Sequence, residues 1–95
     1  MSVTLCVLLW AHEGHEEGLI AYEDRVLELL REHGASLLQR ARTDGSGGAP
    51  LEVQILEFPS EAALSAYLGD ERRAALAGDR DHAIARTDIL RVALI

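Results

Sequence analysis

Two stretches of the chain concentrate side chains that can hold a metal ion or move a proton. The first is His12-Glu13-Gly14-His15-Glu16, the densest group of ligand types in the sequence. The zinc-protease helix motif needs two histidines four residues apart on a formed helix, whereas these are three apart and Gly14 stands between them. We therefore interpret the stretch as a polar turn whose acids favour a helix N-terminus, and we predict no metal. His12 is kept as a candidate catalytic group.

The second stretch is Arg80-Asp81-His82, late in a predicted helical region. A histidine that titrates near neutral pH suits a general base when a carboxylate orients it. Adjacent helix residues point about 100° apart, so Asp79 is a better partner for His82 than Asp81 is. The alternative is a surface helix with paired charges. His82 is the second catalytic candidate.

Arg40 and Arg42 alternate with Ala41 on a predicted strand, so they share one face. Two guanidinium groups on one face can clamp a small carboxylate, which makes Arg42 the third catalytic candidate. The alternative, which we favour, is pairing with Glu52 or Glu57 on the neighbouring strand.

Three aromatic residues are candidate ligand-binding residues. Tyr22 and Tyr67 lie on the apolar stripes of two predicted helices and can present phenols to a cleft between helices and sheet. Plain core packing is the alternative for both. Trp10, the only tryptophan, ends the first predicted strand. Cys6 lies within that strand and is interpreted as a small inert core residue.

The hydrophobic pattern predicts the elements that position these side chains. Residues 3–10 are apolar at odd and even positions, which is typical of a strand buried on both faces. A helix is expected over 15–33, closed by Gly34 in a left-handed conformation. Strands over 36–42 and 51–58 pair as a hairpin. Their glycine-rich loop is not a phosphate loop, because a strand follows it rather than a helix.

The rest of the chain is predicted to be helical and then extended. Ser60 caps one helix, and Asp70 caps a second piece that runs to about residue 83 and turns Ala74, Ala75 and Leu76 inward. The last strand is expected over 87–94. The order predicts one ferredoxin-like α+β domain over 1–95, with βαββαβ topology, a four-stranded antiparallel sheet and both helices on one face. The other face is left apolar, which predicts a homodimer.

Charge and length exclude several classes of protein. The 95 residues include 16 acidic residues and 9 arginines with no lysine, and the net charge is −7. An acidic protein is not expected to bind nucleic acid or an anionic membrane surface. No apolar run approaches the roughly 20 residues of a spanning helix. A single cysteine cannot form an intramolecular disulfide, so we expect a cytoplasmic protein.

Three segments carry a resemblance to a known family. They are Tyr22-x-x-x-Val26-x-x-Leu29-Leu30-x-x-His33-Gly34-Ala35, then Phe58-Pro59-Ser60-Glu61-Ala62-Ala63, then Asp70-x-Arg72-Arg73. Together they resemble the short bacterial domain-of-unknown-function 1330-like proteins of the dimeric alpha-beta barrel superfamily. In that superfamily two ferredoxin-like subunits pack sheet against sheet.

The resemblance implies cofactor-free oxygenase or isomerase chemistry on a small hydrophobic or polyketide-like substrate. The related enzymes use Asn, Trp and His near the cleft, but this sequence has no Asn and its Trp10 stands on a strand. No catalytic residue is therefore carried over. The hypothesis is a dimeric protein that binds or converts a small molecule between helices and sheet. The alternative is a non-catalytic ligand-binding or assembly module, since fold does not determine function.

Overall fold

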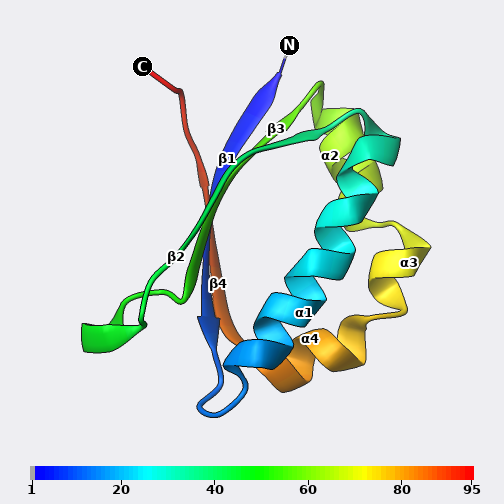
Figure 1. Ribbon diagram of the computed structural model, residues 1–95. Coiled ribbons are helices and arrows are strands. Elements are labelled where there is room, and N and C mark those ends of the chain that lie inside the picture. The colour runs from blue at the N-terminus through cyan, green and yellow to red at the C-terminus, as the bar shows by residue number, and fades with distance from the viewer. Residues whose placement is uncertain (1) are drawn as a thin grey trace.

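The computed structural model describes residues 2–95 and contains four strands with helices between them (Figure 1). The strands are β1 (Val3–Ala11), β2 (Ser36–Arg42), β3 (Glu52–Phe58) and β4 (Ile84–Arg91). The helices are α1 (Glu16–Leu27), α2 (Glu61–Leu68), α3 (Glu71–Ala74) and α4 (Ala77–Ala83), with 3-10 turns η1 (Glu28–His33) and η2 (Ser46–Gly48).

The sheet has the order β2-β3-β1-β4, and all neighbouring strands are antiparallel. All the α-helices lie on one side of it (Figure 1). This arrangement confirms the predicted ferredoxin-like α+β fold and the predicted hairpin of β2 with β3. It also creates two unlike faces, one covered by helices and one uncovered.

The core lies between the sheet and the helices. Alternate residues of β1 point into it, so Val3, Leu5, Val7 and Leu9 are buried. They meet Leu19 and Val26 of α1 together with Phe58 and Leu64. The intervening residues of β1 reach the other side and are only half-buried in this chain. β1 is therefore apolar on both faces, but the helices of this chain cover only one of them.

The predicted helix ends are largely where the sequence placed them. Gly34 takes a left-handed conformation (φ 69°) and closes the 3-10 turn after α1. The hydroxyl of Ser60 accepts a hydrogen bond from the Ala63 amide at 3.1 Å, and the Asp70 carboxylate accepts one from the Arg72 amide at 2.8 Å. Each cap satisfies a backbone N–H that the helix itself leaves free.

Three predicted boundaries need correction. The first helix continues to residue 33 only as a 3-10 turn. The second helical piece is interrupted after Ala74, because the chain turns there and packs Leu76 against the core, and Ala74 and Ala75 are exposed rather than inward. The last strand begins at Ile84, three residues earlier than expected, since α4 leads directly into it.

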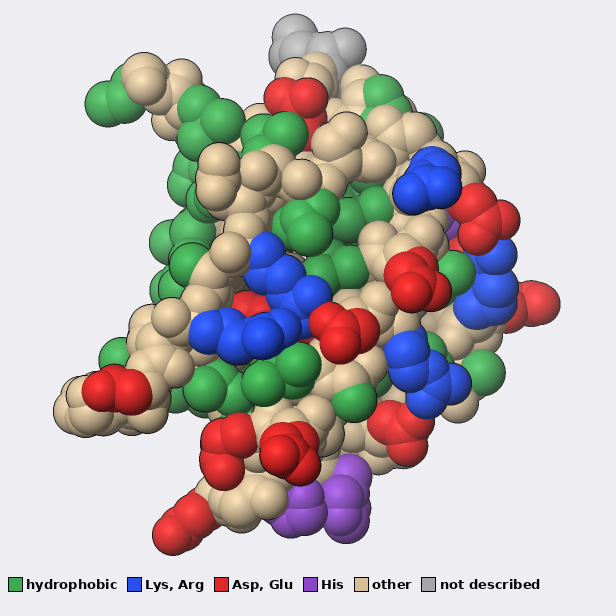
Figure 2. Space-filling model, viewed as in Figure 1, with side chains coloured by type: hydrophobic (Ala, Val, Ile, Leu, Met, Phe, Trp, Pro, Cys, Tyr) green, Lys and Arg blue, Asp and Glu red, His purple; other side chains and the backbone are tan. Residues whose placement is uncertain are grey.

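The uncovered face is apolar at its centre. Cys6 and Leu8 of β1 pair with Ile55 and Val53 of β3, and Cys6 also pairs with Leu90 of β4. Leu90 is 50 % exposed. Hydrophobic side chains line the side of the molecule that points away from the helices (Figure 2). The β2–β3 loop and the C-terminal segment also lean to that side (Figure 1).

No helix within residues 2–95 is long and apolar enough to cross a membrane.

Candidate functional site

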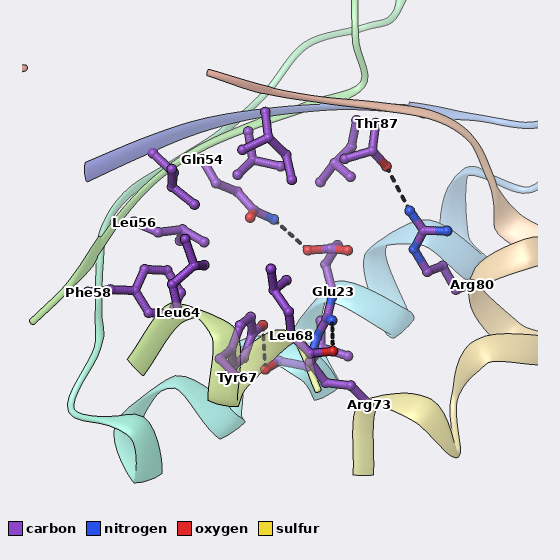
Figure 3. Close-up of a pocket in the computed structure, with 15 residues that line it drawn as sticks. Glu23, Gln54, Leu56, Phe58, Leu64, Tyr67, Leu68, Arg73, Arg80 and Thr87 are labelled. Atoms are coloured by element: carbon purple, nitrogen blue, oxygen red, sulfur yellow. Dashed lines mark hydrogen bonds between the residues drawn. The ribbon is translucent and has the colours of Figure 1, made fainter. Parts of the chain in front are cut away.

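A cavity of about 280 Å³ opens between the sheet and the helices (Figure 3). Its walls are mostly apolar side chains from β1, β3, α1 and α2. The polar groups that border it are Glu23, Gln54, Arg73, Arg80 and Thr87. A concave apolar pocket with a few polar groups is the usual form of a small-molecule site.

Glu23 of α1 is the most unusual of these groups. It lies four residues after Leu19 and three before Val26, on the stripe that faces the sheet, and it is only 6 % exposed. Its carboxyl group points into the cavity toward β3, where Gln54 Nε2 donates a hydrogen bond of 2.8 Å to Glu23 Oε1 (Figure 3). A carboxyl group in such a place has little access to water.

A second buried carboxylate lies beside it. Gln54 Nε2 also donates to Glu52 Oε2 at 2.6 Å. Arg40 Nε and Arg42 Nε donate to the two oxygens of Glu52 at 2.8 and 3.1 Å. Both arginines thus pair with Glu52, the alternative that we favoured. Their charges keep Glu52 ionised inside the protein, where an unpaired carboxylate would be costly.

The two carboxyl groups titrate in opposite directions. Burial raises the pKa of Glu23, and the negative charge of Glu52 raises it further against the hydrogen bond from Gln54. Burial also acts to raise the pKa of Glu52, but hydrogen bonds from Arg40, Gln54 and Arg42 outweigh it and lower that pKa. Two acids whose pKa values are pushed apart are suited to different roles, one as a fixed charge and one as a proton carrier.

Tyr67 and Arg73 close one end of the cavity. Tyr67 Oη donates to the Val26 carbonyl at 3.0 Å, and burial raises the pKa of Tyr67 to about 12, so it stays a phenol. The Arg73 guanidinium carbon lies 4.7 Å from the Tyr67 ring centroid, and Arg73 Nη1 donates to the Leu68 carbonyl at 3.3 Å. Arg73 Nε is buried without a hydrogen-bond partner in the described part of the chain. Arg73 therefore keeps donor capacity that the protein does not use.

Arg80 borders the opposite side. Arg80 Nη2 donates to Thr87 Oγ1 at 3.4 Å, and the closest carboxylate oxygen paired with it belongs to Asp81 at 3.9 Å. Both contacts are long for hydrogen bonds of a guanidinium group. The guanidinium groups of Arg73 and Arg80 therefore both border the cavity with donor capacity that the protein itself uses only partly.

The residues selected from the sequence are distributed over several places. Tyr67 borders the cavity, whereas Tyr22 and His82 line a separate groove of about 410 Å³ between α1 and α4. In that groove the rings of His15 and His82 meet edge to face, 4.7 Å apart. Asp79, the expected partner of His82, instead accepts a bond from Arg25 at 3.4 Å.

The other three candidates lie outside the cavity. Arg42 is exposed at the end of β2 and holds Glu52. Trp10 is on the uncovered face, where Nε1 donates to the Gly48 carbonyl at 2.9 Å and the Arg86 guanidinium lies over the ring. His12 is exposed in the turn before α1. Within residues 2–95 no group of three or more His, Cys, Asp or Glu side chains could hold a metal ion.

Glu23, Gln54, Arg73 and Arg80 were not selected as cavity residues from the sequence. For Glu23 and Gln54 the sequence did contain a pattern that could have marked them. Glu23 stands on an otherwise apolar helical stripe, and Gln54 alternates with Glu52, Leu56 and Phe58 on one strand face. A polar residue at a core position needs a partner or a purpose. No comparable pattern marks Arg73 or Arg80, because the bend between α3 and α4 decides where they point.

Comparison with known proteins identifies the fold but does not identify an activity. No protein-family model matches the sequence, and no curated protein matches it. Among solved structures, PA3566 from Pseudomonas aeruginosa is similar with a TM-score of 0.77 and 19% identity, covering 99% of this chain and 94% of that one.

Two further structures name the architecture. A dabb family protein with a ferredoxin-like fold from Mesorhizobium loti has a TM-score of 0.71 and 15% identity, covering 99% of this chain and 97% of its own. A dimeric protein of unknown function with a ferredoxin-like fold from Bacteroides fragilis has a TM-score of 0.68 and 13% identity, covering 98% and 96%. The structural neighbours are thus ferredoxin-like proteins of the dimeric alpha-beta barrel kind, and at these identities the likeness concerns the fold alone.

Proposed function

We propose that this chain is a small-molecule-binding protein that holds its ligand in the cavity between the sheet and the helices. The observation that carries the proposal is the combination of Glu23, Gln54 and Arg73 around an apolar cavity of about 280 Å³. Small-molecule pockets typically measure about 300–1,000 Å³, and this cavity is just below the lower end of that range, so it suits a small ligand the size of one substituted ring. The ligand would be largely apolar with a polar end.

The charge arrangement supports a ligand with an acidic or carbonyl end. Arg73 and Arg80 border the cavity with long or unused donor contacts, while Glu52 is already neutralised by Arg40 and Arg42. An oxygen-bearing ligand would satisfy the Arg73 donor, whose burial without a partner costs about 1–3 kcal/mol.

The uncovered face of the sheet supports a homodimer. A second copy that packs its own uncovered face on this one would bury Cys6, Leu8, Ile55 and Leu90. Such a two-fold contact is self-complementary by construction. The dimeric Bacteroides fragilis neighbour has the same fold, which agrees with this arrangement.

Further parts of the proposal rest on the sequence. We place the chain among the bacterial domain-of-unknown-function 1330-like proteins because of the three segments that resemble them, as one domain over 1–95. The single Cys6 favours the cytoplasm. A fractionation of cells that express the tagged chain tests the location.

Binding of phenylacetate tests the proposal. It has one ring and one carboxylate, and its site can be located by chemical-shift changes at the amides of Glu23, Gln54 and Arg73. Val7→Phe fills the cavity from β1 and should weaken binding at least about 10-fold. The control Ala66→Phe adds the same ring at an exposed position of α2 and should leave binding unchanged.

Two results would contradict binding in the cavity. One is the absence of shift changes at millimolar phenylacetate and, in native mass spectrometry, of any copurified molecule. The other is equal affinity of Val7→Phe and the unchanged protein, both folded by circular dichroism. The remaining alternative is then an assembly module, which the uncovered face would still support.

A further inference from the structure

The cavity contains a carboxyl group that the fold itself does not need. Glu52 holds two arginines to the sheet, whereas Glu23 receives a single hydrogen bond, from Gln54, within the described residues. Glu23 Oε2 therefore has free capacity on the side of the cavity (Figure 3). A buried carboxyl group that is not used for stability is a candidate for chemistry.

We propose that this cavity catalyses proton transfer at a carbon atom next to a carbonyl group, with Glu23 as the base and Arg73 as the donor to the carbonyl oxygen. The inference rests on the proposed small-molecule function and adds a reaction to it. The substrate class is a small, mostly apolar carbonyl compound with an acidic C–H bond.

The step balances without a cofactor or a co-reactant. Glu23 takes the proton, so the C–H bond breaks and an O–H bond forms on its carboxylate. The electron pair of the C–H bond moves into the carbon–carbon bond, and the carbonyl electrons move to the oxygen. The resulting enolate oxygen is stabilised by the Arg73 guanidinium group. The protonated carboxyl group of Glu23 then returns the proton to the same carbon or to a conjugated one, which gives exchange or isomerisation.

The position of Glu23 suits a base of this kind. Burial raises its pKa, and a base with a higher pKa removes a proton from carbon more effectively. Arg73 lines the same cavity as Glu23, so both groups can face one bound molecule (Figure 3). Gln54 fixes one carboxyl oxygen at 2.8 Å and thereby directs the other into the cavity.

Arg73 suits the role of oxyanion donor for a separate reason. Its guanidinium group is positioned over the Tyr67 ring and by the Leu68 carbonyl, but none of the described carboxylates forms an ion pair with it. A charged donor fixed in a water-poor site stabilises a developing negative charge strongly. Arg80, on the far side beside Thr87, can hold a second oxygen of the substrate.

Hydrogen–deuterium exchange at C3 of phenylpyruvate tests the inference. This probe adds an enolisable carbonyl group to the phenylacetate skeleton, and loss of its C3 proton signal in D2O can be followed by NMR against buffer alone. The unchanged protein should accelerate exchange. Glu23→Gln should lose about 100-fold or more of that acceleration while it remains folded by circular dichroism.

Further variants separate the roles. Arg73→Gln should reduce both the rate and the affinity, and Glu23→Asp should retain part of the rate because it keeps a carboxylate. Glu17→Gln, at an exposed position of the same helix, should exchange phenylpyruvate as fast as the unchanged protein.

The possible failures are distinguishable. If phenylpyruvate binds in the cavity but its exchange is not accelerated, the proton-transfer inference is overturned and the binding function stands. If folded Glu23→Gln is as fast as the unchanged protein, Glu23 is not the base. If neither phenylacetate nor phenylpyruvate binds, the proposed function and this inference both fail.

Discussion

Each face of the sheet contains residues that its burial alone would not suggest. The face that the helices cover contains Glu52 and Gln54 beside Leu56 and Phe58 on one strand. The face that no helix covers presents Cys6, Leu8 and Ile55 at its centre. Two polar residues of β3 therefore lie in an otherwise apolar core, and apolar residues lie half-buried on a face that this chain alone does not cover.

Each exception has a different physical meaning. Polar groups inside are stable only because they are paired, and here Arg40 and Arg42 reach in from the edge strand to neutralise Glu52. Apolar groups outside gain free energy only when another surface covers them. We propose that the covered face holds a ligand and the uncovered face a second copy of the chain, and the following changes test this division.

The largest effect is expected at the core of the covered face. Phe58→Ala removes a ring that is fully buried against the helices, and the free energy of unfolding should fall by about 3–5 kcal/mol. Urea unfolding monitored by circular dichroism measures it. A loss below about 1 kcal/mol would show that the helices pack on β3 only loosely.

The second effect concerns the uncovered face. Leu8→Asp places a charge at the centre of the proposed dimer contact, once in each subunit. With about 2 kcal/mol lost per subunit, the dimer dissociation constant should rise about 1,000-fold. Sedimentation at micromolar concentration measures it, and Ala66→Asp on exposed α2 is the control. A monomeric unchanged protein would contradict the homodimer.

The third effect compares the two neighbouring acids. Glu52→Gln removes an ionised group that two arginines need, so the free energy of unfolding at neutral pH should fall by about 1–3 kcal/mol. Glu23→Gln should raise it, because the charged form of Glu23 is disfavoured by burial. If both variants changed the free energy of unfolding in the same direction, Glu52 and Glu23 would not have the different roles proposed for them.

The pH dependence of these variants follows from the shifted pKa values. The pKa of Glu23 is raised, so its contribution to stability is present below its unfolded-state pKa and is lost as pH rises through the folded one. The pKa of Glu52 is lowered, so its contribution is present above the unfolded-state pKa and is lost as pH falls through the folded one. Both differences from the unchanged protein should shrink toward about pH 4 and below. Unfolding curves at several pH values check this.

The smallest effect is expected at Tyr67. Tyr67→Phe keeps the ring that packs on Phe58 but removes the hydrogen bond to the Val26 carbonyl, which should cost about 1 kcal/mol. Thermal unfolding measures it. A much larger loss would mean that the phenol also organises Arg73, and the phenylacetate affinity of the same variant would then fall as well.

Much of the fold could be predicted from local patterns. The strand over residues 3–10, the caps at Ser60 and Asp70 and the left-handed Gly34 depend on residues close together in the sequence, and the structure agrees with each. Burial of that strand on both faces is not seen within this chain, where only alternate residues are buried. The break at Leu76 could not be predicted in this way. It depends on core contacts made by residues far apart in the chain, which override helix propensity.

The candidate site was less accessible to prediction. Tyr67 was expected at the cleft and borders it, whereas His12, His82 and Arg42 lie elsewhere. Those three were chosen because reactive side chains stand near each other in sequence. The cavity instead combines Glu23 of α1 with Gln54 of β3 and Arg73 of α3, which are separated by 31 and 19 residues along the chain, as their numbers show.

The sequence alone determined the order of elements, the strand over residues 3–10 and the excess of apolar surface on one sheet face, because periodicity and turn chemistry act over a few residues. Only the tertiary structure decided which carboxyl group became isolated in an apolar cavity. A pKa and a free donor depend on every neighbour within several ångströms, and most neighbours of Glu23 come from other elements of the chain.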